Sequence, residues 1–288
     1  MTEAPVCVWR LEAALGEGPV WIDGALWFVD IKAHQVHRFV PSTGERRSWL
    51  APAQVGFVLP ASDGKFIAGL QGGLSLFDPG SAKFTSLCPV EQDLPNNRLN
   101  DAVVDSEGRL WFGTMDDGEQ AQSGAFYRYA RGAVEPAGVG RIAITNGPAV
   151  SPDGQRMYWV DTLAGTISAC ALRPDGALGE SSVLITIPAE EGHPDGPSID
   201  SEGCLWVGLY GGWEARRYSP MGELLKRVRF PVANITKLAF GGPDLRTAFA
   251  TSARQHLSPA EIVQQPDAGG VFQFDVDVPG VPCPVITA

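Results

Sequence analysis

The chain has 288 residues, of which 44% are hydrophobic and 19% charged, a composition typical of a folded globular protein. Its 33 acidic against 22 basic residues give a formal net charge of -11, which argues against a protein that binds nucleic acid through phosphate contacts. Uninterrupted apolar runs such as Leu26–Val29 are far shorter than the roughly 20 residues of a membrane-spanning helix, so no membrane span is expected.

The N-terminus and the cysteines indicate the compartment. The first ten residues include Glu3 and lack the basic start and apolar stretch of a signal peptide, so we expect a cytoplasmic protein. The five cysteines are odd in number and widely spread, and no two of them form a Cys-x-x-Cys pair. We therefore predict reduced thiols, most of them packed as small hydrophobic side chains.

A short pattern recurs six times along the chain. Each copy has an acidic residue, followed by glycine in five copies, and then a run of strand-forming residues. The copies begin at Asp23, Asp63, Glu107, Asp153, Glu202 and Asp244. An acidic residue and glycine between two apolar runs is typical of a tight turn between antiparallel strands. The copies lie on average about 44 residues apart, which is the length of a four-stranded propeller blade.

In chain order, each turn is predicted to join the innermost strand of a blade to the next strand outward. Third strands are expected at 36–40, 74–77, 125–129 and 215–218. Residues 6–10 precede the first inner strand, and we expect them to complete the last blade and close the ring. A short helix is predicted over 258–263 from its Ser-Pro start. The sequence thus predicts one all-β domain over 1–288, a six-bladed β-propeller with four antiparallel strands per blade. An unclosed β-sandwich is the alternative.

Polar residues stand at one register before the turns of different copies. They are Glu17, Asn100, Asn146 and Asp195, with Gly56 and Lys237 at the equivalent places of the second and sixth copies. In a propeller these positions begin the inner strands and face the axis at one level. Two carboxylates and two carboxamides then form an oxygen-rich pocket that needs a cation, because buried carboxylates without one would be costly. The donors favour one divalent metal, Ca, Mg, Mn, Zn or Fe(II), over copper. Simple turn chemistry before Gly-Pro is the alternative explanation for these residues.

Further polar residues are predicted around this centre. Arg98 and the stretch Asp116–Glu119 are expected on loops at strand ends, where propellers carry substrate contacts. Arginine suits a carbonyl or hydroxyl-rich ligand because its donors are forked, and an ordinary surface charge is the alternative for Arg98. Among the four histidines, His193 alone is expected near the pocket, as a loop residue rather than a ligand or base.

Nearly the whole chain resembles the gluconolactonase family, which includes senescence marker protein (regucalcin) and bacterial sugar-acid lactonases. The matching motifs are Leu15–Trp21, Asn97–Asp101, Trp111–Met115, Thr145–Pro148, Pro194–Gly196, Phe240–Asp244 and Gln265–Gly270. The chain is most similar to the bacterial branch that acts on aldonolactones, pentonolactones such as xylonolactone among them.

The resemblance implies a six-bladed propeller with one catalytic divalent cation held by Glu17, Asn146 and Asp195. It also implies that Arg98 and Asn100 bind the sugar lactone and that Asp195 acts as the base.

One substrate contact departs from the family pattern. Animal members carry an acidic residue shortly after Gly-Thr-Met, and Gly118 occupies that place here. The resemblance therefore implies that a neighbour, Asp117 or Glu119, makes this contact.

The expected activity is metal-dependent hydrolysis of an aldono-1,4- or 1,5-lactone to the aldonic acid. The substrate is a pentonolactone such as xylonolactone, or gluconolactone, and no nucleic acid, membrane or obligate protein partner is expected. Hydrolysis needs a polarised carbonyl and an activated water, and a metal in an open site provides both. The alternatives are a propeller that binds a divalent cation or a sugar without turnover, another esterase or phosphotriesterase on the same scaffold, and a protein-interaction propeller.

Overall fold

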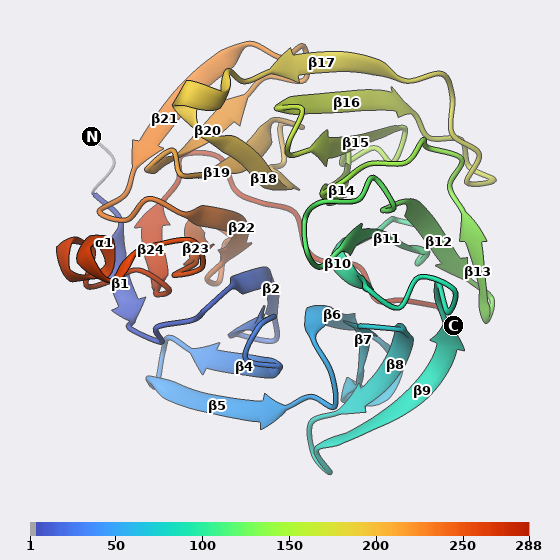
Figure 1. Ribbon diagram of the computed structural model, residues 1–288, viewed down its shortest axis with the longest axis horizontal. Helices are drawn as coiled ribbons and strands as arrows, with labels where there is room; N and C mark the ends of the chain where they lie inside the picture. Colours follow the sequence, from blue (N-terminus) through green and yellow to red (C-terminus); the bar gives the residue numbers. More distant parts are fainter. Residues whose placement is uncertain (1–3, 288) are drawn as a thin grey trace.

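The computed structural model describes residues 4–287, and the ends of the predicted domain range, residues 1–3 and 288, lie outside the described residues. Antiparallel sheets are arranged side by side in a ring around one axis (Figure 1). This arrangement is a β-propeller, and it differs from a sandwich, in which two sheets pack face to face. The all-β fold built from four-stranded antiparallel sheets is therefore confirmed.

The described residues contain four separate sheets of four strands, each in chain order. The first contains β2 (Gly16–Ile22), β3 (Ala25–Asp30), β4 (Gln35–Val40) and β5 (Glu45–Leu50). The second contains β6 (Val55–Pro60), β7 (Phe66–Leu70), β8 (Gly73–Asp78) and β9 (Lys83–Pro89). The third contains β10 (Asn97–Val104), β11 (Leu110–Asp116), β12 (Phe126–Ala130) and β13 (Ala133–Pro136). The fourth contains β14 (Thr145–Val150), β15 (Arg156–Asp161), β16 (Thr166–Ala171) and β17 (Ser182–Thr186).

A further sheet of eight strands completes the ring. Its order is β1 (Val6–Trp9), β24 (Val271–Asp275), β23 (Thr247–Ser252), β22 (Ile235–Gly241), β18 (His193–Ile199), β19 (Leu205–Tyr210), β20 (Glu214–Tyr218) and β21 (Leu224–Arg229). A single parallel pairing, Gly196 with Lys237, joins β22 to β18 in the middle of this sheet. The strands on either side of this junction pair antiparallel.

The predicted turns and the predicted helix are present. Each acidic turn joins an innermost strand to the next strand outward, as at Asp23 and Gly24 between β2 and β3. Both of these residues have positive φ, 49° and 76°, which a type I′ hairpin turn requires. The helix α1 (Pro259–Gln264) is capped by Ser258, whose side chain and that of Glu261 form a reciprocal capping box.

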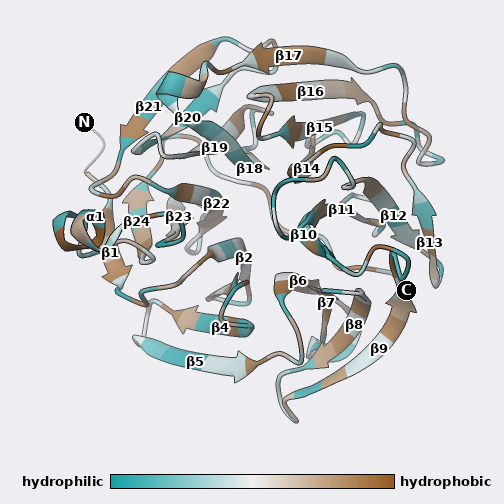
Figure 2. Cartoon of the chain, viewed as in Figure 1, coloured by the Kyte–Doolittle hydropathy of each residue, from teal (hydrophilic) through white to brown (hydrophobic). Residues whose placement is uncertain are grey.

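Burial decreases from the axis outward. The strands β3, β7 and β11 are fully buried, whereas five of the six residues of the outer strand β5 are exposed. Accordingly, β5 is largely hydrophilic in colour (Figure 2). The core lies between neighbouring sheets, for example where the rings of Trp27 in β3 and Phe66 in β7 lie with their centroids 4.3 Å apart.

The innermost strands bring distant parts of the sequence together. Each of β2, β6, β10, β14, β18 and β22 contacts the next along the chain, and β22 contacts β2. The starts of these strands therefore meet at one end of the axis, and their ends meet at the other.

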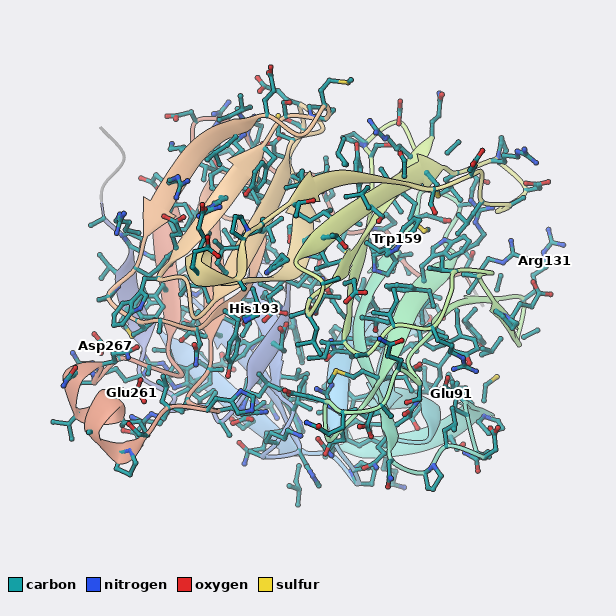
Figure 3. The ribbon with its side chains drawn as sticks, turned by 45° about the horizontal axis from the view of Figure 1, so that its top comes forward. Glu91, Arg131, Trp159, His193, Glu261 and Asp267 are labelled. Atoms are coloured by element: carbon teal, nitrogen blue, oxygen red, sulfur yellow. The ribbon has the colours of Figure 1, made fainter. Side chains whose placement is uncertain are left out.

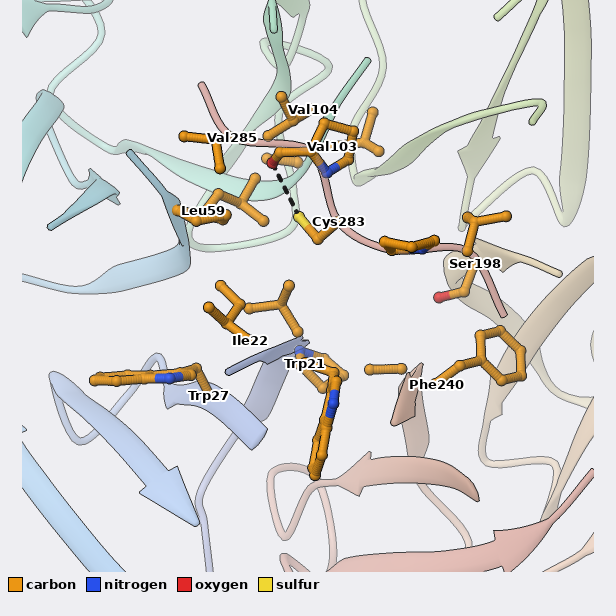
Figure 4. A pocket seen from close by; sticks show the side chains of 18 of the residues that line it. Trp21, Ile22, Trp27, Leu59, Val103, Val104, Ser198, Phe240, Cys283 and Val285 are labelled. Atoms are coloured by element: carbon orange, nitrogen blue, oxygen red, sulfur yellow. Dashed lines mark hydrogen bonds between the residues drawn. The ribbon is translucent and has the colours of Figure 1, made fainter. Parts of the chain in front are cut away.

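The far end of the axis holds an apolar cavity of about 870 Å³ that is covered by the C-terminal segment. This segment is fixed on both sides, because Gly280 donates to the carbonyl of Leu245 and Ile286 donates to that of Pro60. Figure 4 shows its Cys283 among the apolar side chains that line this cavity, Ile22 included.

Two further expectations concern the thiols and the membrane. All five cysteines are free, as predicted, but only Cys170 and Cys204 are buried, whereas Cys7, Cys88 and Cys283 are half-buried. Within residues 4–287, no helix has the length and the apolar character that crossing a membrane would require.

Candidate active site

A cavity of about 230 Å³ lies where the innermost strands begin. The four aligned residues with side-chain oxygens and the predicted arginine line it, namely Glu17, Asn100, Asn146, Asp195 and Arg98, whereas Lys237 does not. Each of these side chains is buried. The sequence alignment of the copies therefore selected residues that meet in space.

An irregularity of the strand pairing explains why these side chains share one level. The pairing register shifts in each innermost strand at the aligned position, for example after Glu17 in β2 and after Asn146 in β14. The other shifts enclose Gly56, Asn100, Asp195 and Lys237. Bulges of this kind release the local pairing and redirect a side chain, which here turns toward the axis.

Hydrogen bonds fix the orientation of both carboxamides. Arg98 has only donors, so the Asn100 atom 2.6 Å from its Nη1 is the oxygen Oδ1. The Asn100 Nδ2 then donates to Asn146 Oδ1 at 3.1 Å and to the carbonyl of Thr145. The Asn146 Nδ2 donates to Thr162 Oγ1, which leaves Asn146 Oδ1 on the side of Asn100 and the cavity. Asn146 therefore offers an oxygen to a ligand, whereas the Asn100 oxygen is bound to Arg98.

The two carboxylates at the centre are not neutralised by the protein. Glu17 Oε2 accepts a hydrogen bond from the N–H of Gly18 at 2.8 Å, and in the described part of the chain neither Glu17 nor Asp195 forms a salt bridge. Burial, followed by the charge of Asp101, raises the pKa of Glu17 to about 7. Burial, followed by the charge of Glu17, raises the pKa of Asp195 well above its usual value. The protein alone thus disfavours two ionised carboxylates here.

This donor set fits a divalent cation. The carboxylates of Glu17 and Asp195 and the Oδ1 of Asn146 are oxygen donors of the type that hard divalent cations prefer. A cation would also supply the positive charge that the two buried carboxylates lack. In residues 4–287, no group of three His, Cys, Asp or Glu side chains could hold a metal, so a metal site here depends on the carboxamide.

Arg98 is held in place by Asp117, which is a different role from the one predicted for Asp117. Arg98 Nε donates to Asp117 Oδ1 at 2.8 Å, and Asp117 also binds Lys32 Nζ at 2.5 Å and Gln54 Nε2 at 2.9 Å. Although burial opposes ionisation, these hydrogen bonds and positive charges lower the pKa of Asp117. Asp117 therefore lies behind Arg98, outside the cavity lining, and Glu119 is the predicted acidic residue that lines the cavity.

The expectation that His193 alone among the histidines lies near the site is wrong. His193 lines the cavity and lies toward the middle of the molecule, in contrast to Arg131 at its edge (Figure 3). His256 lines the cavity as well, and its Nδ1 lies 3.2 Å from the Tyr210 hydroxyl. His256 was missed because it belongs to the long connection between β23 and β24, where the alignment of copies gives no position.

A buried ion pair beneath the site was also missed. Lys237 Nζ lies 2.5 Å from Asp101 Oδ1, and Asp101 Oδ2 accepts a hydrogen bond from the N–H of Gly147 at 2.8 Å. Lys237 stands at the aligned position of the sixth copy, and Asp101 directly follows Asn100. The alignment of the copies therefore indicated that both residues lie near the axis, but it did not indicate the contact between them.

Comparison with known proteins gives a family. Residues 15–254 match the model of the SMP-30/Gluconolactonase/LRE-like region. The chain is 33% identical over 283 residues to the 6-deoxy-6-sulfogluconolactonase of Pseudomonas putida, with 97% of each chain covered. It is 35% identical over 264 residues to the L-arabinolactonase of Azospirillum brasilense, covering 90% of this chain and 87% of the relative. Both relatives are named as lactonases, which are hydrolases that act on cyclic esters.

A solved structure shares the whole fold. It is that of a calcium-binding protein, regucalcin, from Agrobacterium tumefaciens, with a TM-score of 0.95 and 30% identity over 100% of this chain and 98% of the other. The match of the family model covers well over half of the chain, and the relatives match almost from end to end. The chain therefore belongs to the SMP-30/gluconolactonase/LRE-like family.

Proposed function

We propose that the protein is a metal-dependent sugar lactonase that hydrolyses an aldonolactone to the aldonic acid. The observation that supports this most is the meeting of Glu17, Asn146 and Asp195 with the donors of Arg98 in one cavity of about 230 Å³. The family supports it too, because relatives that match nearly the whole chain are named as lactonases of sugar acids. A pentonolactone or gluconolactone is the proposed substrate.

Glu17, Asn146 and Asp195 would hold one divalent cation. When bound, such a cation polarises an ester carbonyl and lowers the pKa of a water molecule. The name of the Agrobacterium structure gives calcium as the ion of that protein, and Ca, Mg, Mn, Zn and Fe(II) are the ions to compare here.

The residues of the chain would orient the lactone and move one proton. In Arg98, Nε donates to Asp117 and Nη1 to Asn100, so Nη2 is the nitrogen left to donate to the carbonyl or a hydroxyl of the substrate. Asp195, which lies two innermost strands further round the ring in β18, would accept the proton of the attacking water. Donors placed where negative charge develops on the carbonyl oxygen would lower the barrier to ring opening.

We further propose six blades in a single domain. The single parallel pairing between Gly196 and Lys237 is the natural division of the eight-stranded sheet. Division there gives one unit of β18–β21 and a second of β22–β24 with β1 outermost. In this arrangement the N-terminal strand completes the last blade, which protects its edge.

The proposed activity is tested by acid release from xylonolactone, arabinonolactone and gluconolactone. The protein is stripped with a chelator and then supplied in turn with Ca, Mg, Mn, Zn and Fe(II). We expect release above the spontaneous rate only when metal is present, and loss of this rate in Glu17→Ala and Asp195→Ala. Asp153→Asn, on the exposed turn between β14 and β15, is the control and should keep full activity. Full activity of the Asp195→Ala protein would refute the mechanism.

The second candidate is a propeller that binds a cation without catalysis. It is favoured by the calcium-binding regucalcin structure, which has the same fold over the whole chain. In this case calorimetry would detect metal binding that Glu17→Ala removes, while no lactone would open faster than in a blank. The presence of Arg98 in the cavity favours the lactonase, since a simple cation buffer has no need of a buried donor beside its carboxylates.

A further inference from the structure

The turn from Arg254 to Leu257 forms part of the cavity wall. The N–H of Leu257 donates to the carbonyl of Arg254 at 3.0 Å, so Gln255 and His256 are the central residues of a β-turn. Positive φ at the second of these, 67° at His256, is the pattern of a type II turn, in which glycine is favoured at this position. His256 therefore has a backbone conformation that is less favourable for a residue with a side chain, and this side chain lines the cavity.

This turn is fixed to the strand that carries Glu17. The N–H of Arg254 donates to the carbonyl of Ala13 at 3.1 Å, and that of Gln255 donates to the carbonyl of Ala14 at 2.8 Å. Both acceptors lie just before β2. The side chains of the turn are therefore held at a constant place relative to the proposed metal ligands.

Hydrogen bonds define the orientation of the Gln255 amide. The Tyr210 hydroxyl donates its proton to the carbonyl of Gln255 at 2.5 Å, so its oxygen can only accept from His256 Nδ1, which lies 3.2 Å away. With the proton of the ring on Nδ1, His256 Nε2 is an acceptor, and Gln255 Nε2 lies 3.2 Å from it and 3.3 Å from Glu119 Oε1. Both hydrogens of the Gln255 amide thus face acceptors, whereas the reversed amide would place its oxygen against the Glu119 carboxylate.

The oxygen of this amide has no donor. Gln255 Oε1 is buried, and within residues 4–287 it has no hydrogen-bond partner. A buried acceptor without a partner is unfavourable, and in native proteins such an atom usually indicates a missing ligand or water. Gln255 lines the cavity although its Oε1 is enclosed, so a shift of this side chain on binding would bring Oε1 to a hydroxyl group of the bound molecule, which supplies the donor.

We propose that Gln255 is a specificity-determining residue that accepts a hydrogen bond from a ring or chain hydroxyl of the sugar lactone. His256 and Glu119 are positioning residues that hold its amide in the required orientation. This inference rests on the proposed lactonase function, and it adds that a hydroxyl-bearing lactone is preferred to a lactone without hydroxyls.

The test compares gluconolactone or xylonolactone with δ-valerolactone, which has no hydroxyl group. Gln255→Met keeps the length of the side chain and removes the acceptor. We expect its kcat/KM for the sugar lactone to fall about tenfold or more, mainly through KM, and that for δ-valerolactone to change less than about twofold. Gln71→Met is the matched control, since that amide lies in the turn between β7 and β8, donates to the carbonyl of Pro95 and does not line the cavity; both values should stay unchanged.

A second variant separates positioning from structure. His256→Gly removes the imidazole and places glycine where the turn favours it, so we expect Tm to stay constant or rise while kcat/KM for the sugar lactone falls severalfold.

Four results would overturn the inference. Equal losses on both lactones in Gln255→Met would show a purely structural role, and no loss on the sugar lactone would show that the amide does not recognise it. A wild-type protein that opens δ-valerolactone as well as sugar lactones would leave the lactonase intact but refute the hydroxyl preference. A wild-type protein that opens no lactone with any of the metals would refute the proposed function and this inference together.

Discussion

Lys237 Nζ and Asp101 Oδ1 lie 2.5 Å apart, and this buried ion pair joins β22 to β10 across the axis of the propeller. Asp101 also accepts from the N–H of Gly147, which directly follows Asn146. The methylene chain of Lys237 packs against Gly196, which directly follows Asp195, so closely that a Cβ on Gly196 would lie 2.7 Å from Cδ. The ion pair therefore supports the backbone behind two of the proposed metal ligands.

Removal of Lys237 should destabilise the protein strongly. Lys237→Met would leave the Asp101 carboxylate buried without a partner, and breaking a buried pair in this way costs about 3–5 kcal/mol. The double variant Lys237→Met/Asp101→Asn removes that charge, and we expect it to recover part of the loss. Urea unfolding measures both. Lys226→Met, which breaks an exposed pair with Asp277, is the control and should cost far less than Lys237→Met. A single variant as stable as the control would contradict the importance of the pair.

Asp117 and Arg98 should act as one unit toward the substrate. Asp117→Asn weakens the contact that holds Arg98 Nε, so we expect a higher KM for the lactone with a smaller change in kcat. Because Asp117 acts through Arg98, the double variant Asp117→Asn/Arg98→Met should be no worse than Arg98→Met alone. Steady-state kinetics of the three variants test this, and additive losses would show that Asp117 contacts the substrate independently.

Gly56 should be required where two innermost strands approach each other. A Cβ at this position would lie 2.4 Å from the carbonyl oxygens of Leu99 and Asn100, and such backbone atoms move only at a cost. Gly56→Ala is therefore expected to lower the free energy of unfolding by about 1–3 kcal/mol and to disturb Asn100. Gly140→Ala is the control, since nothing lies within 4 Å of its Cβ position. Equal stability of the two variants in thermal unfolding would show that the strands can separate without strain.

The hairpins, and the position of the site residues along the propeller axis, could be predicted because both depend on short sequence patterns that recur in each copy. The turn at Asp23 and Gly24 is encoded by adjacent residues, and every innermost strand shifts its pairing register at the aligned position. Once one repeat is aligned, residues as distant as Glu17 and Asp195 fall on the same level. The sequence could therefore indicate a ring of oxygen donors without any knowledge of distances.

Contacts outside the repeat could not be predicted in this way. Lys237 and Asp101 are separated by 136 residues, and their pairing depends on how far each side chain reaches across the axis. Gln255 and His256 belong to the connection between β23 and β24, which is longer than the same connection in every other copy, so that no position can be inferred from the alignment. Asp117 was expected at the substrate. Its hydrogen bonds to Lys32 and Gln54, which come from other parts of the ring, instead hold its carboxylate on the side of Arg98 that faces away from the cavity.

His37 introduces a titrating group into the apolar core between the sheets. Its side chain is completely buried, its ring centroid lies 5.0 Å from that of Phe28, and its Nδ1 lies 2.8 Å from Ser48 Oγ. Within residues 4–287 the other ring nitrogen has no hydrogen-bond partner. Burial therefore disfavours the charged imidazolium and lowers the pKa of His37 from 6.5 to about 4, although the charge of Asp30 opposes this shift.

This shift predicts that the protein loses stability in weak acid. Between about pH 6.5 and pH 4 the unfolded chain binds a proton at His37 and the folded chain does not, so the free energy of unfolding falls as the pH falls through this window. The contribution is fully present above pH 6.5, and its loss reaches about 3 kcal/mol at the acid end. His37→Phe cannot take up the proton, so urea unfolding at pH 7.5 and pH 4.5 should show a smaller loss in the variant than in the wild type. The other titrating groups are common to both proteins and cancel in this comparison. The same loss in both would mean that the imidazole is protonated inside the folded protein without a penalty.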